Sequence, residues 1–315
     1  MKKKLIFLCS VIMVFTLVSV LLIQSVQKGD TNEKHLVVTS FYPVYLLTKN
    51  LTQGVEGIEV KNLTENHTGC LHDYTLTTKD MKLLERADLL VLNGAGMEEF
   101  LEPLLIEQEV EHIIDTSEGI VLLEGVSHTH EHEHEYADEH EEEEHNHGTE
   151  NAHIWLNVEN YILQLDTIKE ALCVFDSENA EIYETNFQNY TEELAVLQEK
   201  REELKVQTAG KEVVIFHDAF AYLAQMLEME VVHSLALDED TSLSAGTLAH
   251  VMEEVQLHQI EYLFVEETYK QTAELIAEET GAIVYCLNPI THGSGELTDY
   301  VDSMMKNMEL IEREK

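Results

Sequence analysis

The chain has few basic residues, few prolines and few cysteines, and each scarcity argues against a class of protein. Lysine and arginine number 19 against 61 aspartates and glutamates, so the formal net charge of the 315 residues is −42. Nucleic acids and anionic lipid surfaces attract basic proteins, so this charge favours a cation as the partner instead. Three prolines exclude a proline-rich linker architecture, and four cysteines are too few for a disulfide scaffold. A hydrophobic fraction of 44% is enough for a sizeable core.

The N-terminus combines a short basic start with a long apolar run. The letters MKKK at Met1–Lys4 precede Leu5–Ile23, which contains no charged residue. A run of this length is near that needed to span a bilayer, and its basic start is typical of an export signal. We therefore expect residues 1–30 to be a signal peptide or an N-terminal membrane anchor. The remainder would be exported to the cell surface or periplasm, and the pattern leaves cleavage or anchoring open.

Two stretches of the chain alternate short apolar runs with helical patterns. Strands are expected at 35–42, 57–63, 88–92 and 112–115 in the first stretch, and at 213–216, 231–237, 262–265 and 283–287 in the second. This alternation predicts an α/β fold with parallel sheets. The predicted division is an N-terminal lobe at 35–175, a linking helix at 176–208 and a C-terminal lobe at 211–315. At ~1.5 Å per residue the helix would be roughly 45 Å long, enough to join both lobes.

A segment at 127–150 interrupts the first lobe with histidine and glutamate, and we name it the His/Glu segment. It lacks apolar periodicity, so we expect a disordered loop. A solvated acidic tract is the usual interpretation of such a run. Histidine at every second position is not needed for solvation, however, and favours capture of metal ions by exchangeable ligands. The histidines concerned are His128, His130, His132, His134, His140, His145 and His147.

Three further histidines stand near predicted strands or turns. His72 precedes Asp73, His153 lies in AHIWL, and His217 ends a predicted strand before Asp218. Ligands of open α/β sheets gather at the carboxyl ends of the strands, so two imidazoles from the first lobe and one from the second could grip a cation between the lobes. Three imidazoles suit zinc, with the adjacent aspartates as acceptors that orient the rings. Spacing alone leaves equally open that the three are unrelated, because no H-x-n-H motif occurs.

The segments that carry these histidines resemble the metal-binding component of zinc and manganese ABC importers, the ZnuA-like cluster A-I solute-binding proteins. The resemblance covers nearly all of the chain from His35. LHDYTLTTKDMKLLERADLLVLNGAGMEEFL resembles the first-ligand segment, AHIWL the second and IFHDAFAYLAQML the third, while SAGTLAHVMEEV and YLFVEE resemble the helix and strand that follow. The resemblance implies two (βα)-type lobes joined by a long rigid α-helix, with the metal in the cleft between them.

The same resemblance implies the site residues, the ligand and the partner. His72, His153 and His217 would bind Zn²⁺, and Glu266 would contact one of these ligands without binding the metal itself. The partner would be an ABC permease in the membrane, and the protein a monomeric receptor without enzymatic activity. Manganese-type members place carboxylates where His217 and Asn288 stand here. Because manganese prefers carboxylate oxygen, zinc is expected and a manganese-type receptor is the alternative.

The fourth ligand and the class of function leave alternatives open. Where relatives have an acidic residue near the last loop, LNPITHG offers Asn288, Thr291 and His292, so the fourth ligand would be His292, a water or an acidic neighbour. A zinc hydrolase would use three histidines and an open position for water, although no H-E-x-x-H motif occurs and Glu266 is the nearest candidate base. A surface adhesion or metal-buffering protein would use the His/Glu segment as its working part.

Overall fold

The computed structural model describes residues 34–65, 67, 69, 71, 74–107, 112–125, 150–235 and 245–312. The predicted signal peptide or anchor, His72, Asp73 and the seven histidines of the His/Glu segment lie outside these ranges. Within the ranges, no helix has the length and apolar character needed to cross a bilayer. The expectations for the N-terminus and for the His/Glu segment therefore stay predictions.

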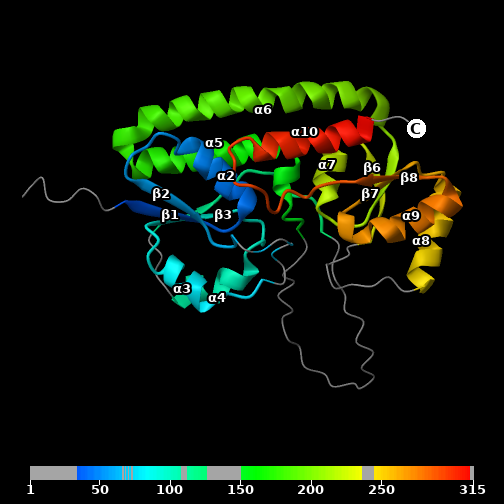
Figure 1. The fold of residues 1–315 in the computed structure, drawn as a ribbon, viewed down its shortest axis with the longest axis horizontal. Helices are drawn as coiled ribbons and strands as arrows, with labels where there is room; N and C mark the ends of the chain where they lie inside the picture. The colour runs from blue at the N-terminus through cyan, green and yellow to red at the C-terminus, as the bar shows by residue number, and fades with distance from the viewer. Residues whose placement is uncertain are drawn as a thin grey trace, which may run out of the picture.

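Four short parallel strands form the first sheet, in the order β2-β1-β3-β4 (Figure 1). The two central strands are apolar runs that are buried almost throughout, as expected where helices cover both faces of a parallel sheet. The strands are β1 (His35–Thr39), β2 (Ile58–Asn62), β3 (Leu89–Leu92) and β4 (Ile113–Asp115).

Local sequence signals start the helices of this first lobe. Pro43 lies in the first turn of α2 (Tyr42–Leu51), where its missing N–H costs no hydrogen bond. Thr77 and Asp80 form a reciprocal capping box at the start of α3 (Thr78–Leu84). The chain then forms η2 (Glu99–Leu101), α4 (Glu102–Glu107), η3 (Ile154–Leu156) and α5 (Val158–Phe175).

The second sheet repeats the topology of the first, with four parallel strands in the order β6-β5-β7-β8. Its strands are β5 (Glu212–Ile215), β6 (Glu230–Ser234), β7 (Tyr262–Val265) and β8 (Ile283–Cys286). Between them lie α7 (Phe220–Met226), α8 (Ala245–His258), η5 (Glu267–Tyr269) and α9 (Lys270–Thr280). The fold is thus two α/β lobes, as the sequence predicts.

The two lobes share one long helix. After the short turn η4 (Ser177–Asn179), α6 (Ala180–Thr208) runs for 29 residues along both lobes (Figure 1). The last helix, α10 (Asp299–Glu312), returns to lie beside α6, although it follows the second sheet in the chain. Tyr300 of α10 stacks on Tyr161 of α5 with ring centroids 3.5 Å apart, and its hydroxyl donates to the Trp155 carbonyl at 2.7 Å. The C-terminal helix therefore packs against the first lobe as well as against the second.

Successive residues of a strand point to opposite faces of the sheet and pack into different apolar clusters. Val37 and Val91 face a central cluster that also contains side chains from α5, α6, α7 and α10, whereas Val38 and Leu90 face a separate cluster with Leu84 of α3. The second sheet divides in the same way, and its outer cluster packs against α8 and α9. This division follows from the two-residue period of a strand. The central cluster is continuous across both lobes and fixes their relative placement.

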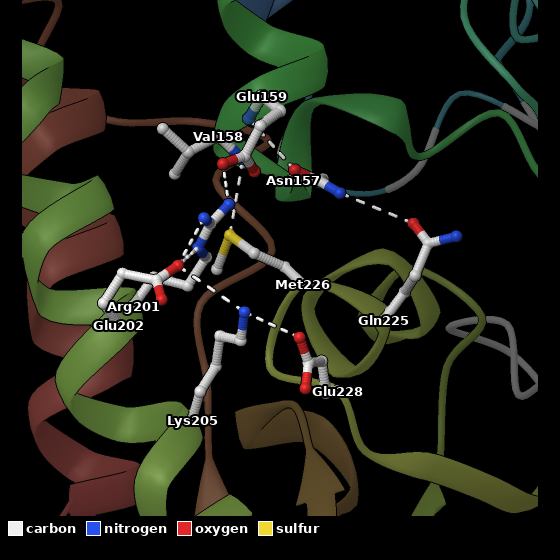
Figure 2. Close-up of polar contacts among 9 residues, drawn as sticks. All are labelled: Asn157, Val158, Glu159, Arg201, Glu202, Lys205, Gln225, Met226 and Glu228. Carbon is white, nitrogen blue, oxygen red and sulfur yellow. Dashed lines mark hydrogen bonds and ion pairs between the residues drawn. The ribbon is translucent and has the colours of Figure 1, made fainter. Parts of the chain in front are cut away.

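Polar contacts join α5, α6 and α7 where the lobes meet (Figure 2). Arg201 of α6 pairs with Glu159 at the start of α5, and Lys205 lies 2.6 Å from Glu228, just after α7. Solvent-exposed ion pairs contribute only about 0–1 kcal/mol each. They therefore set the direction of α6 against each lobe more than they stabilise the junction.

A buried polar network closes the carboxyl edge of the first sheet. The backbone N–H groups of Asn93 and Gly94 donate to the Glu98 carboxylate at 2.7 and 3.1 Å. The Asn93 amide donates to the Ala152 carbonyl at 2.9 Å, and Gln164 of α5 donates to Asn93 Oδ1 at 3.1 Å. Burial raises the pKa of Glu98 to about 7, although the hydrogen bonds that its carboxylate makes with Ser40, Asn93 and Gly94 oppose the rise. The network ties the strand edge to the segment that carries His153.

We expect Tyr300→Phe to lower the free energy of unfolding by about 1–3 kcal/mol, because the buried Trp155 carbonyl loses its donor. Urea unfolding at neutral pH measures the change. Tyr45→Phe is the matched control, since the contacts described for Tyr45 are made by its half-buried ring. Equal stability of Tyr300→Phe and the wild type would contradict the role given to this hydrogen bond.

The Glu98 carboxyl predicts a pH dependence of stability. Its pKa in the folded protein lies above the ordinary value of 4.5, so the folded state holds the proton more tightly than the unfolded state. The resulting stabilisation is complete below about pH 4.5 and is lost as the pH rises through about 7. At about 1.4 kcal/mol per pKa unit, the wild type should lose about 3 kcal/mol relative to Glu98→Gln between pH 4.5 and pH 8.

Denaturant unfolding of both proteins across this range tests the prediction. Glu99→Gln, at an exposed neighbour, controls for general loss of charge. A constant difference between wild type and Glu98→Gln from pH 4.5 to pH 8 would rule the effect out.

Candidate metal site

His153 lies at the start of the short turn η3 and is 3% exposed. Its backbone N–H donates to the side-chain oxygen of Asn151 at 3.0 Å, and its Nδ1 lies 2.9 Å from the same oxygen. An amide oxygen only accepts hydrogen bonds, so Nδ1 carries the proton in this contact. In the neutral ring with the proton on Nδ1, the lone pair that a metal ligand needs is on Nε2.

His217 comes from the other lobe, in the turn between β5 and α7, and is 7% exposed. Its Nδ1 makes a short hydrogen bond to Oε1 of Glu266, the residue directly after β7. A carboxylate behind an imidazole fixes the ring and increases its basicity. His217 therefore resembles His153 in having an oxygen acceptor at Nδ1.

The rings of His153 and His217 meet edge to face. Their centroids are 4.9 Å apart with an interplanar angle of 81°. Asn151 also donates to the backbone carbonyl of Asp218 at 2.8 Å, which ties the segments of the two histidines together. Among the residues that sequence reasoning selected, the structure brings together these two histidines and Glu266.

The remaining predicted residues are placed differently or lie outside the described ranges. The Asp218 carboxylate makes a short hydrogen bond with the Ser234 hydroxyl. His292 is exposed, and Thr291 Oγ1 lies 3.4 Å from its Nδ1. His72 and Asp73 are outside the description. In the described part of the chain, no three His, Cys, Asp or Glu side chains are placed to hold one metal ion together.

The loop expected to supply a fourth ligand is anchored beside His153. Trp155, two residues after His153, donates through its indole N–H to the Pro289 carbonyl at 2.8 Å. The next residue, Ile290, is fully buried with a φ of 60°. A β-branched side chain is strained in this left-handed region, so the surrounding packing must hold it there. The loop is therefore fixed against the His153 turn.

The ends of the His/Glu segment are fixed at the same place. Glu124 and Glu150 form an antiparallel bridge, and the Asn151 N–H donates to the Leu123 carbonyl at 2.8 Å. The described structure stops at Gly125 and resumes at Glu150, three residues before His153. Sequence reasoning did not identify Asn151, Trp155 or Tyr222 as residues that hold the site. The Tyr222 hydroxyl donates to the Asn151 carbonyl at 2.8 Å. The one available signal was an asparagine two residues before a histidine, which is weak by itself.

Comparison with known proteins gives consistent matches. The family model described as "Zinc-uptake complex component A periplasmic" matches residues 37–314. The high-affinity zinc uptake system protein ZnuA of Bacillus subtilis is 30% identical over 291 residues, which cover 90% of this chain and 88% of that protein. The zinc-binding protein AdcA of Streptococcus pyogenes is 30% identical over 323 residues, which cover 99% of this chain but 61% of that protein. The chain therefore spans less than two thirds of the length of AdcA.

A solved structure supports the same assignment. The crystal structure of Zn(II)-bound AdcA from Streptococcus pneumoniae matches with a TM-score of 0.69 and 25% sequence identity, over 89% of this chain and 58% of that one. The family model extends over both sheets and the helices around them. The chain belongs to the ZnuA family, the periplasmic component A of zinc-uptake complexes.

Proposed function

We propose that the protein is an extracytoplasmic receptor that binds Zn²⁺ with high affinity and delivers it to an ABC-type permease in the membrane. The observation that carries the proposal is the meeting of His153 and His217 across the two lobes. Both rings are buried, and both have Nδ1 held by an oxygen acceptor. The matches to zinc-uptake proteins support zinc as the cargo and a membrane complex as the destination.

The spacing of the two rings suits one tetrahedral ion. Zinc accepts imidazole nitrogen at ~2.0–2.1 Å, so two imidazoles on one tetrahedral ion have their ring centroids roughly 5 Å apart. The observed separation is 4.9 Å. We propose His72 as the third ligand, and His292, a water or an acidic neighbour as the fourth. Nitrogen donors favour zinc over manganese, which prefers carboxylate oxygen.

Glu266 is better suited to positioning than to catalysis. In a zinc hydrolase it would be the nearest candidate base, but its carboxylate contacts Nδ1 of His217, on the side of the ring away from Nε2. There it orients a ligand. The family match is to a component of an uptake complex, which also supports a receptor without enzymatic activity.

The His/Glu segment would raise the supply of cations near His153, which it precedes in the chain. Its last residue, Glu150, forms a bridge with Glu124, which shortly precedes the segment. Glu150 lies three residues before His153. Tethering a weak binder next to a strong one raises the effective concentration of the shared ligand. The net charge of −42 also attracts a dication.

Removing the three proposed ligands should abolish tight binding. We expect the triple variant His72→Ala, His153→Ala and His217→Ala, with residues 127–149 deleted, to bind Zn²⁺ at least ~1,000-fold more weakly than the deleted chain with its histidines intact, because each lost nitrogen removes a metal bond. Isothermal titration measures the affinity. His112→Ala, His250→Ala and His258→Ala, at exposed histidines, form the matched control. Full one-site binding by the triple ligand variant would sink the proposal.

Deleting residues 127–149 alone should leave the tight site intact. A short Gly/Ser linker can close the gap, because the bridge holds the two ends together. We expect one tightly bound zinc per chain, with loss of additional weaker equivalents. Elemental analysis and titration give identity and stoichiometry, and a full-length chain with the seven segment histidines changed to asparagine is the control. Loss of all binding would show that the segment, and not the three-histidine site, holds the metal.

A further inference from the structure

Asn151 uses every polar group it has, and the contacts lie on both lobes. It is 4% exposed. Its backbone N–H donates to the Leu123 carbonyl at 2.8 Å, and its carbonyl accepts from the Tyr222 hydroxyl at 2.8 Å. Its side-chain oxygen faces His153, and its amide N–H₂ donates to the Asp218 carbonyl at 2.8 Å.

We propose that Asn151 is the positioning residue that couples the two metal-binding histidines. It sets the tautomer of His153 through the Nδ1 contact, and it holds the residue after His217 through the amide donor. The inference rests on the proposed function, because it names the residue that presets the distance between two proposed zinc ligands. Nothing in the sequence pattern assigns this role.

A local turn does not account for these contacts. An asparagine that stabilises its own turn needs only the hydrogen bond from the backbone N–H two residues later, here that of His153. The contact with the imidazole Nδ1 and the donation to Asp218 lie outside such a turn. Both are retained in a buried site, where each polar group must find a partner.

The surroundings hold Asn151 on both sides. Tyr222 lies on α7 of the second lobe, and its hydroxyl also accepts from the Leu123 N–H at 3.0 Å. The next residue, Ala152, is held by Asn93 of the first lobe. The 151–153 segment is thus fixed to each lobe by separate hydrogen bonds, with the side chain of Asn151 as the direct link between the histidines.

An amide fits this position better than a carboxylate. The side chain must accept from His153 and donate to Asp218 in the same conformation. Aspartate keeps the acceptor but would set a carboxylate oxygen against the Asp218 carbonyl. Asn151→Asp therefore separates the two roles, and Asn151→Ala removes both.

The test combines titration of Zn²⁺ with a measurement on the metal-free protein. We expect Asn151→Ala to weaken zinc binding about 10- to 100-fold, the usual loss when a residue that orients a metal ligand is removed. Asn151→Asp should lose less. Nitrogen-15 NMR of the imidazoles should show Nδ1–H for His153 in the wild type and in Asn151→Asp, and a change toward Nε2–H in Asn151→Ala. Cobalt(II) absorption should report a distorted site in Asn151→Ala.

The matched control is Asn157→Ala. Asn157 also links the lobes, through a 3.4 Å hydrogen bond to Gln225, and it caps α5 through Glu159, but the contacts described for it do not include either histidine. We expect zinc affinity within about twofold of wild type and an unchanged His153 tautomer. Thermal unfolding of each variant shows whether it folds, and the isosteric Asn151→Asp keeps the test valid if Asn151→Ala does not.

The outcomes separate this inference from the proposed function. If Asn151→Ala binds zinc as Asn157→Ala does and keeps the Nδ1–H tautomer, the positioning role is overturned while the receptor function stands. If the wild type binds no zinc, the receptor function fails, and the tautomer in metal-free protein still decides whether Asn151 sets the ring of His153. Intermediate affinity for Asn151→Asp with a retained tautomer supports both parts of the inference.

Discussion

The proposed metal site depends on the edge-to-face contact of His153 and His217, which belong to different lobes. Two buried imidazoles at this distance require the carboxyl edges of both parallel sheets to face each other. Each ring is held from behind by an oxygen acceptor, from Asn151 on one side and Glu266 on the other. The pair can therefore be buried before any metal arrives.

The helices that both lobes share fix the position of His153 relative to His217. α6 runs along both lobes and α10 lies beside it, so the central apolar cluster continues from one sheet to the other. Protein interiors are close-packed and resist deformation, so a large hinge motion would have to break this cluster. Changes on binding or release of a ligand should then be confined to the segments at the carboxyl edges.

The acidic surface and the nitrogen-lined site act at different ranges. A net charge of −42 attracts cations over the reach of screened electrostatics, about 8 Å at physiological ionic strength, without distinguishing one dication from another. Discrimination requires ligands of chosen type at fixed positions. His153 and His217, the ligands proposed for zinc, each have Nδ1 held against an oxygen acceptor, which fixes the ring. Attraction and selection are thus carried by separate parts of the molecule.

The sequence alone determined the fold class, because apolar runs bounded by turn signals report strand and helix locally. It misplaced ends: the strand expected over 35–42 ends at Thr39, and α2 begins at Tyr42, since Pro43 favours the first turn of a helix. The local pattern also selected His153 and His217 as candidates, and the family resemblance added Glu266. Only the tertiary structure decided that the two rings meet and that Asn151 links them. Contacts between residues far apart in the chain depend on strand order and on the packing between the lobes. The local sequence pattern around each residue does not predict them.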